Sequence, residues 1–447
     1  MSDSTSAPVF TPAAQQQQAL ALVRDWFPHS SPAWRPYFYL AGFAGTGKST
    51  ILPWLIQRSC GLRDHEVIVC SLTAQAARVA GNKLKRQQLD DVRTSTIHGL
   101  LYTPTVRREL LWHTDGTPML DDLTGKQQFE RKLDFVTRDG LHRRSKDLRH
   151  VKLLIIDEAP MAPQDAYRDL LELGIPLLCL GDTAQLPPIH APEHIYVDFS
   201  RPDFELTDIL RQKGESQIID VGAKVRQGYV IEYGVYGRGD LTAMNYASFH
   251  ADAAKRNAWM TGADQIIVAT NNMRHLVNKT MRDIYGFSRH GKLAVGDKLI
   301  CLKNNKDLFL GDDTLTNGLI VHVKAVHRIN ERSETAVVTL ATTDVDGNEV
   351  TETLSIHLGA LGQNRNGFEM MKMSKQRGKH LGIFDYAYAI TCHKAQGSEW
   401  ENVIILHEPL GDTPYARWVY PAMTRASRNI LFVSDVGRPM PRVAANP

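Results

Sequence analysis

Residues 37–50 read YFYLAGFAGTGKST, an apolar run that leads directly into a glycine-rich turn and a lysine. The turn fits the pattern G-x-x-x-x-G-K-S/T, with Gly42, Gly47, Lys48 and Ser49 in register. Glycines let backbone N–H groups crowd around phosphate oxygens, and the helix expected next points its positive N-terminal end at them. The stretch therefore predicts a strand, a phosphate-binding loop and a helix, which together begin a parallel α/β domain.

The loop also predicts how a nucleotide and a metal ion are held. Lys48 is expected to neutralise the β- and γ-phosphates, and the Ser49 hydroxyl to bind Mg²⁺. The residues expected to line the nucleotide are Gly42, Ala44, Gly45, Thr46, Gly47, Lys48, Ser49 and Thr50. A kinase, a switch protein and a motor can all begin with such a loop, so the rest of the chain must distinguish them.

Length and composition describe an ordinary globular protein. A chain of 447 residues is long enough for roughly three domains. The net charge is only +3, so any affinity for nucleic acid must come from local basic surfaces. The five cysteines form no C-x-x-C pair, which favours reduced thiols over a disulfide framework or a zinc site. No apolar run is long enough to span a membrane, and the polar N-terminus lacks a signal-peptide core, so we expect a cytoplasmic protein.

Further apolar runs predict two parallel sheets. Runs at 66–74, 151–159 and 175–183 are almost continuously apolar and end in polar residues. Such runs are typical of strands buried on both faces, and open α/β sheets bind ligands at the carboxyl ends of their strands. A second series predicts a second α/β unit, with runs at 265–272, 385–391, 402–408 and 429–435.

Two segments interrupt the alternation of strands and helices. Residues 101–149 contain ELLWHTDGTPML, in which Asp115-Gly116 is a hairpin signal. Residues 296–380 contain β-like runs separated by turns, which predict a small barrel. We therefore expect a first domain at 1–100 and 150–212 with an insertion at 101–149, and a second domain at 213–295 and 381–447 with an insertion at 296–380.

Candidate catalytic groups follow the predicted strands of the first domain. Asp157 and Glu158 end LLIIDEAPM (153–161), where Asp157 is placed to hold Mg²⁺ through water and Glu158 to polarise an attacking water. Acids also favour helix N-termini, so the pair alone leaves that alternative open. Gln185 in LGDTAQLPPI carries an amide able to touch a γ-phosphate and the lytic water, although periodicity alone favours a proline-rich turn.

Two arginines complete the set. Arg211 lies in ELTDILRQ (205–212), and Arg425 lies in YPAMTRASRNILFV (420–433) before a strand of the second unit. A lone arginine is usually a solvated surface charge. Each of these two belongs to a motif, and each is expected to reach a nucleotide held between the two units.

The motifs resemble, in order, those of superfamily 1 helicases. They are GFAGTGKST, SLTAQAA, TSTIHGLL, IIDEAPM, GDTAQLPP, LTDILRQ, AITCHKAQGSE and AMTRAS, and they extend over residues 10–433. The chain looks most like superfamily 1B, the 5′-to-3′ branch that contains the RecD-like and Dda-like helicases. This resemblance implies two RecA-like domains of the P-loop NTPase class, one with a β-hairpin pin inserted and the other with a small SH3-like β-barrel.

The resemblance also implies roles for individual residues. Gln15 or Gln16 is expected to read the adenine, and Gln16 has the family's spacing to Ala19. Arg211 and Arg425 match arginine fingers. Gln396-Gly397 would couple the DNA track to the nucleotide, and Glu399 matches a ribose-contacting glutamate of the opposite-polarity branch. The residues implied for the single-strand track are Thr73, Thr96, His98, Thr391 and His393.

Some positions remain open at this point. Pro160 and Phe43 depart from the family pattern, and Pro160 leaves the geometry after Glu158 uncertain. Trp112 in the predicted pin suits either stacking on a junction base or packing in a core. Segment 363–380 carries five Lys or Arg residues and one acid, so it suits a solvated loop or an arm touching the pin or the DNA backbone.

The function implied is that of an ATP- and Mg²⁺-dependent DNA helicase. The protein is expected to be a DNA-dependent ATPase that moves 5′ to 3′ on single strands and unwinds duplexes. The alternatives are an RNA or RNA–DNA remodelling ATPase and a nucleotide-switched single-strand clamp. The presence of Glu158, Gln185 and Arg425 argues against the clamp, and a P-loop kinase has no use for TCHKAQG.

The same resemblance implies the setting in which the protein works. The expected partners are single-stranded DNA and duplex junctions, with a single-strand-binding protein or replisome components as further candidates. The protein is expected to work as a monomer, without a membrane. Its expected place is the cytoplasm of a bacterium or of a phage-infected host, in replication, repair or recombination.

Overall fold

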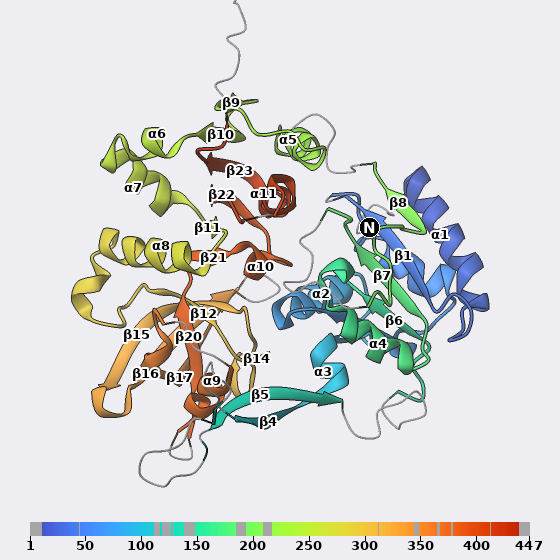
Figure 1. Cartoon of the computed structure of the whole chain (residues 1–447), viewed down its shortest axis with the longest axis horizontal. Helices are drawn as coiled ribbons and strands as arrows, with labels where there is room; N and C mark the ends of the chain where they lie inside the picture. Colours follow the sequence, from blue (N-terminus) through green and yellow to red (C-terminus); the bar gives the residue numbers. More distant parts are fainter. Residues whose placement is uncertain are drawn as a thin grey trace, which may run out of the picture. The chain divides into compact units, whose positions relative to one another are not determined.

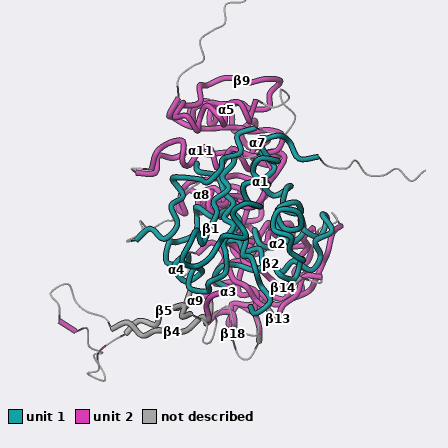
Figure 2. Tube along the Cα trace, turned by 90° about the vertical axis from the view of Figure 1, so that its right-hand side faces the viewer, with its two compact units in different colours: residues 1–72, 76–98, 140–216 teal, residues 73–75, 99–139, 217–447 magenta. Residues whose placement is uncertain are grey.

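The computed structural model describes residues 11–43, 45–110, 117–118, 127, 129–137, 148–184, 194–208, 217–311, 313–343, 348–363, 367–376, 379–411 and 413–437. The chain divides into two compact units, coloured separately in Figure 2. Unit 1 comprises residues 1–72, 76–98 and 140–216, and unit 2 comprises residues 73–75, 99–139 and 217–447. Within the described ranges, no helix is long and apolar enough to cross a membrane.

Unit 1 is built on a parallel six-stranded sheet in the order β3-β2-β6-β7-β1-β8 (Figure 1). Strands β2, β6 and β7 are buried along their whole length, as expected for a parallel sheet covered on both faces. The strands are β1 (Tyr37–Gly42), β2 (Val67–Ser71), β3 (Arg93–Thr96), β6 (Leu153–Ile156), β7 (Leu177–Gly181) and β8 (Phe204–Leu206).

Helices cover this sheet and complete its core. Ala19, Val23 and Trp26 form the apolar stripe of α1 and share one core cluster with Leu40 of β1. The helical elements that lie wholly or partly in unit 1 are α1 (Ala14–Trp26), η1 (Phe27–His29), η2 (Trp54–Ser59), η3 (Asp64–Glu66), α2 (Ala74–Arg86), α3 (Ile97–Leu101), η4 (Ala159–Met161) and α4 (Gln164–Glu172).

Unit 2 contains a second six-stranded sheet, in the order β21-β11-β22-β23-β10-β9. Its strands are parallel except for β9, which pairs antiparallel with β10 at the edge. The strands are β9 (Gly234–Tyr236), β10 (Leu241–Met244), β11 (Gln265–Val268), β21 (Ala389–Thr391), β22 (Trp400–Leu406) and β23 (Ala426–Val433). The helices are α5 (Gln217–Arg226), α6 (Tyr246–His250), α7 (Ala253–Gly262), α8 (Asn271–Ile284), η5 (Phe287–His290), α10 (Cys392–Ala395) and α11 (Tyr415–Met423).

In the sequence, the segment between β11 and β21 of this sheet forms a closed barrel, whose strands have the order β12-β15-β16-β17-β20. The two parallel sheets and the barrel confirm the predicted fold class. The barrel strands are β12 (Lys298–Cys301), β15 (Ile320–Asn330), β16 (Thr335–Thr343), β17 (Glu349–His357) and β20 (Gly382–Tyr386). Around them lie β13 (Asn305–Leu310), β14 (Asp313–Leu315), η6 (Glu331–Ser333), η7 (Leu358–Ala360), α9 (Gly367–Ser374), β18 (Lys375–Gln376) and β19 (Lys379–His380).

The predicted pin segment contains an antiparallel hairpin with longer arms than its turn signal indicates. Strands β4 (Tyr102–Leu110) and β5 (Phe129–Thr137) pair from Tyr102 opposite Thr137 to Leu110 opposite Phe129. The arms end at Leu110 and resume at Phe129, and Asp115-Gly116 itself lies outside the described residues. Hairpin register follows the apolar pattern of both arms as well as the turn, and the ladder brings Val106 opposite Leu133.

Candidate functional site

The phosphate loop follows β1 and is shaped by its glycines. Gly45 and Gly47 have φ angles of 81° and 79°, in the left-handed region that favours glycine. A Cβ on Gly42 would lie 2.8 Å from Thr46 Oγ1 and 3.2 Å from Lys48 Cδ, so the loop leaves no room for a side chain at position 42. The Phe43 amide donates to the Leu206 carbonyl of β8 (3.0 Å), which ties the loop to the sheet.

Lys48 is already held at this loop. Its Nζ donates to the carbonyl oxygens of Gly42 (2.6 Å) and Phe43 (3.1 Å). The ammonium therefore lies beside the backbone that would surround a phosphate, which is the position required for its predicted role. Ser49 and Thr50 follow directly, whereas Ala44 lies outside the described residues.

Asp157 and Glu158 follow β6, at the same edge of the sheet as the loop. The local strand order is β6-β7-β1, and parallel neighbours end at one edge. Asp157 Oδ1 accepts from the Glu158 amide (3.0 Å), and Glu158 has φ 54° and ψ 37°, a left-handed conformation unusual for a residue with a side chain. Such backbone outliers concentrate at functional sites.

Pro160 fits behind these acids because Gly181 has no side chain. A Cβ built on Gly181 would lie 2.9 Å from Pro160 Cγ and closer still to its Cδ. On the other side of the turn, the Tyr167 hydroxyl donates to the Ala159 carbonyl (2.6 Å). The departure from the family pattern at Pro160 is therefore matched by the glycine that ends β7, a residue that the sequence analysis did not single out.

The two glutamines that are candidates for reading adenine make different contacts in the structure. Gln16 is 1% exposed, donates from Nε2 to the Thr46 carbonyl of the phosphate loop (3.0 Å), and accepts from the Ala13 amide. Gln15 instead accepts from the amides of Thr207 (2.8 Å) and Asp208 (2.9 Å), after β8. Of the two, Gln16 contacts the loop directly, and its reading of adenine stays a prediction.

Besides Ala44, three predicted site residues lie outside the described residues: Trp112, Gln185 and Arg211. The chain just before Gln185 is described. Asp182 and Thr183 follow β7, and Thr183 Oγ1 donates to the Glu205 carboxylate of β8 (3.1 Å).

The candidate DNA-track residues lie in both units. Thr96 ends β3, and His98 follows in α3. In unit 2, Thr391 ends β21 and His393 lies in α10. Burial lowers the pKa of both His98 and His393 below the usual value, so each imidazole is neutral at pH 7. Thr73, the fifth candidate, follows β2.

Arg425 and Glu399 lie near each other at the amino-terminal ends of β23 and β22. Arg425 donates to the carbonyls of Pro421 (Nε, 3.2 Å) and Ser398 (Nη1, 3.4 Å) and from Nη2 to Thr424 Oγ1 (2.9 Å). Glu399 is exposed. Gln396 is 6% exposed, and neither polar atom of its side chain has a hydrogen-bond partner among the residues that the structure describes. Buried amides usually have hydrogen-bond partners, so Gln396 differs from most buried polar side chains in this respect.

Comparison with known proteins finds similar helicase sequences and structures. A model of the AAA domain matches residues 32–241, and a model of the UvrD-like helicase C-terminal domain matches residues 386–433. The chain is 26% identical over 414 residues to the ATP-dependent RecD2 DNA helicase of Deinococcus radiodurans. That alignment covers 87% of this chain but 45% of the relative, so the chain spans about half the length of the curated relative it matches.

Solved structures of Pif1 helicases share the fold. The Bacteroides Pif1 helicase in complex with ADP-AlF3 and single-stranded DNA superposes with a TM-score of 0.51 and 17% identity, covering 95% of this chain and 92% of that chain. A Pif1 helicase from a study of forked duplex DNA gives a TM-score of 0.50 with the same identity and coverage. The two parallel sheets are therefore RecA-like domains with inserted subdomains, and these matches confirm the resemblance to superfamily 1B helicases of the RecD- and Pif1-like group.

Proposed function

We propose that this protein is an ATP-dependent DNA helicase that translocates 5′ to 3′ on single-stranded DNA and unwinds duplexes. The observation that carries the proposal is the arrangement in unit 1. A phosphate loop that already holds Lys48 shares one sheet edge with Asp157 and Glu158. A binding module has no need of a water-polarising acid at that edge. The alternatives predicted from sequence remain as outcomes of the tests below.

In the proposed reaction, water attacks the γ-phosphate of ATP to give ADP and phosphate. Ser49, and Asp157 through water, would hold Mg²⁺, which neutralises charge on the phosphates. Glu158 and Gln185 orient the attacking water, while Lys48, Arg211 and Arg425 stabilise the charge that develops. The proposal therefore requires residues of both units to act on one nucleotide, so that ATP and ADP favour different arrangements of the two domains.

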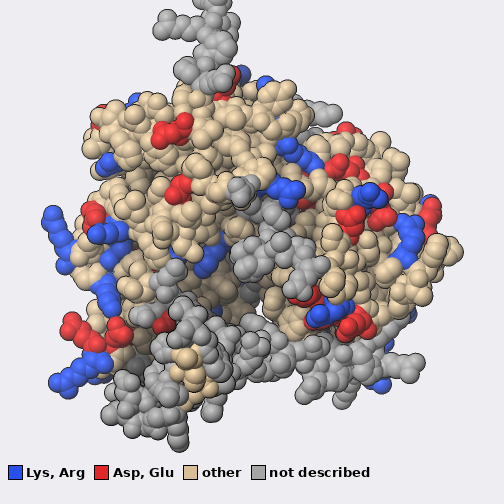
Figure 3. Space-filling model, in the orientation of Figure 1, with Lys and Arg blue, Asp and Glu red and all other residues tan. Residues whose placement is uncertain are grey.

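The single strand would contact Thr73, Thr96, His98, Thr391 and His393. Neutral imidazoles and threonine hydroxyls suit hydrogen bonds to the sugar-phosphate backbone, which give little sequence preference. On the face drawn in Figure 3, lysine and arginine side chains are interspersed with aspartate and glutamate over the described surface. With a net charge of +3, the affinity for DNA should depend on these local contacts and weaken as salt rises.

We infer that the protein acts on single strands and duplex junctions in the cytoplasm, as a monomer, and that a single-strand-binding protein or replisome components are its candidate partners. Trp112 in the pin segment is the proposed contact at the junction.

The decisive experiment measures ATP hydrolysis with no nucleic acid, with single-stranded DNA and with single-stranded RNA, and then unwinding of duplexes with a 5′ or a 3′ tail. We expect DNA to stimulate hydrolysis and only the 5′-tailed duplex to be opened. Stimulation by RNA alone would favour the remodelling ATPase. DNA binding that depends on ATP, without turnover or unwinding, would favour the clamp.

A further inference from the structure

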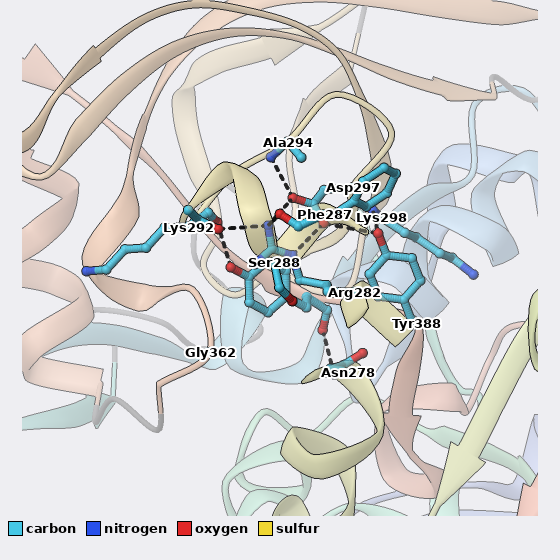
Figure 4. Close-up of polar contacts among 12 residues, drawn as sticks. Asn278, Arg282, Phe287, Ser288, Lys292, Ala294, Asp297, Lys298, Gly362 and Tyr388 are labelled. Carbon is cyan, nitrogen blue, oxygen red and sulfur yellow. Dashed lines mark hydrogen bonds and ion pairs between the residues drawn. The ribbon is translucent and has the colours of Figure 1, made fainter. Parts of the chain in front are cut away.

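The barrel joins the second RecA-like sheet through two chain segments, 291–298 leading in and 385–389 leading out, which we call the neck. A two-segment connection of this kind can act as a hinge unless other contacts fix it. Helix α8 runs beside the neck, and Figure 4 shows its side chains Asn278 and Arg282 together with Asp297 and Tyr388 of the neck.

Three polar residues of α8 lie on the face that a helix normally fills with apolar side chains. Arg274, Asn278 and Arg282 are spaced four residues apart, so they share one stripe of the helix. Their exposed fractions are 4%, 3% and 6%. Buried charges and amides are rare unless they are paired, so each of these side chains needs a specific partner. The R-x-x-x-N-x-x-x-R spacing in residues 274–282 is the sequence signal, and the sequence analysis missed it.

Asn278 binds the outgoing segment of the neck. Its Nδ2 donates to the carbonyls of Tyr386 (3.1 Å) and Ala389 (3.0 Å), and its Oδ1 accepts from the Ala389 amide (2.8 Å). Tyr386 is the last residue of barrel strand β20, and Ala389 is the first residue of sheet strand β21. One amide thus bridges the point where the chain passes from the barrel to the sheet.

Arg282 binds the incoming segment. Its Nε and Nη2 donate to Asp297 Oδ1 (2.9 Å) and Oδ2 (3.1 Å), a two-point contact with a carboxylate that is 0% exposed. The Tyr388 hydroxyl also donates to Asp297 Oδ1 (3.0 Å), so the incoming and outgoing segments are bonded to each other as well as to the helix.

Arg274 adds a third contact, on the barrel side. Its Nη1 donates to Asp385 Oδ2 (2.7 Å), while Asp385 Oδ1 accepts from the amides of Tyr386 (2.8 Å) and Gly362 (2.7 Å). Asp385 is 2% exposed, so this ion pair is shielded from water and salt. The three side chains therefore contact both segments of the neck within one buried layer.

We propose that Arg274, Asn278 and Arg282 form a clamp that locks the neck, so that the barrel and the second RecA-like sheet move as one rigid body. Buried ion pairs contribute little net stability compared with apolar packing, so a fixed geometry is the better reason for their presence. Thr391 lies two residues beyond Ala389, so the clamp also positions the start of the TCHKAQG segment. The consequence for unwinding rests on the proposed function. Whatever movement ATP causes in the second sheet passes undiminished to the barrel.

Distance measurements between spin labels test the rigid connection directly. Glu352→Cys in β17 and Arg428→Cys in β23 place labels at exposed positions of the barrel and the sheet, in a Cys60→Ser background because the other four cysteines are buried. We expect one narrow distance distribution that stays the same without nucleotide, with a non-hydrolysable ATP analogue, and with single-stranded DNA. A distance that shifts or broadens with any of these ligands in the otherwise wild-type protein would overturn the proposal.

A matched pair of variants tests the clamp itself. Asn278→Asp keeps the size and the acceptor of the side chain but removes both N–H donors, whereas Asn272→Asp makes the same change at an exposed position of the same helix. We expect Asn278→Asp to broaden the distance distribution and to lower severalfold the number of base pairs opened per ATP hydrolysed. ATPase activity without DNA should stay near wild type, and Asn272→Asp should change neither quantity. An unchanged distribution in Asn278→Asp contradicts the proposal. A wild-type protein without ATPase activity would instead refute the proposed function and leave the distance test valid.

Discussion

At the scale of single residues, Lys48 and Glu158 lie at one sheet edge and are proposed to have separate tasks. Lys48→Ala removes the cation beside the phosphate loop, and Glu158→Gln keeps the shape of the side chain while removing the charge that is proposed to polarise water. Both variants should lose ATP hydrolysis, but only Glu158→Gln should still bind ATP well. Titration with a fluorescent ATP analogue measures the difference, and an equal loss of binding in the two variants would contradict these roles.

Arg425 is predicted to act on the nucleotide from the second domain. Arg425→Ala should lower DNA-stimulated turnover by roughly 10³-fold or more, as arginine fingers do, with little change in single-strand affinity. Arg428→Ala is the matched control, because Arg428 lies three residues away and is exposed. Turnover in Arg425→Ala that stays close to the control would show that this guanidinium does not contact the transition state.

His407 gives the second domain a predictable response to acid. The imidazole is 5% exposed among Tyr415, Trp418 and Phe432, and burial lowers its pKa from 6.5 to about 4. The folded pKa lies below the unfolded one, so only the unfolded chain gains a proton between these values. Protonation of His407 in the unfolded chain therefore lowers the free energy of unfolding as pH falls.

We expect the free energy of unfolding of wild type to fall by about 2 kcal/mol more than that of His407→Gln between pH 7 and pH 5. Urea denaturation of the two proteins at both pH values measures this difference. If the free energy of unfolding decreased equally in the two proteins, His407 would not be the cause of the pH dependence.

At the scale of elements, the geometry after Glu158 depends on contact between η4 and β7. Gly181→Ala would place a methyl group against the Pro160 ring and force η4, and with it Glu158, to move. We expect kcat of the ATPase to fall markedly while the affinity for ATP, which depends on the phosphate loop, changes little. Steady-state kinetics and nucleotide titration separate the two effects.

The control for this substitution is Gly222→Ala in α5. A Cβ there would lie 3.8 Å from the Tyr420 ring, an ordinary contact distance, and alanine favours a helix by about 1 kcal/mol over glycine. That variant should keep wild-type kinetics and unfold at an equal or higher temperature. If Gly181→Ala also kept wild-type kinetics, η4 would not position Glu158.

The prediction about the pin belongs to the scale of the whole molecule, because it distinguishes translocation along single-stranded DNA from unwinding of duplex DNA. Replacing residues 111–128 by a short turn between β4 and β5, or changing Trp112 to Ala, should leave DNA-stimulated ATPase nearly intact. Unwinding of a tailed duplex should fall much further, since each base-pair step costs about 1.4 kcal/mol of stacking to open.

The alternative role for Trp112, packing in a core, predicts a different pattern. Loss of a core tryptophan costs ~3–5 kcal/mol, so Trp112→Ala would then lower the melting temperature, ATPase and unwinding together. Measuring all three quantities on one preparation distinguishes the two roles. A parallel loss would reject the pin contact for Trp112.

The sequence determined those features that depend on local pattern. The pattern of Gly42, Gly47, Lys48 and Ser49 predicted a phosphate loop, and in the structure Gly45 and Gly47 of that loop adopt the left-handed conformation that glycine favours. Continuous apolar runs predicted buried parallel strands, and the turn-separated β runs predicted the barrel. In each case the signal lies within a few residues of the feature that it specifies.

Only the tertiary structure decided which distant residues meet. Register signals around Asp115-Gly116 did not reveal that Leu110 pairs with Phe129, and nothing local links Gly181 to Pro160. Asn278 bonds to Ala389, 111 residues further along the chain. A helical period shows that Arg274, Asn278 and Arg282 share a face, but not what that face contacts. Those partners are set by how the sheet, the helix and the barrel pack around one core, which is a property of the whole chain.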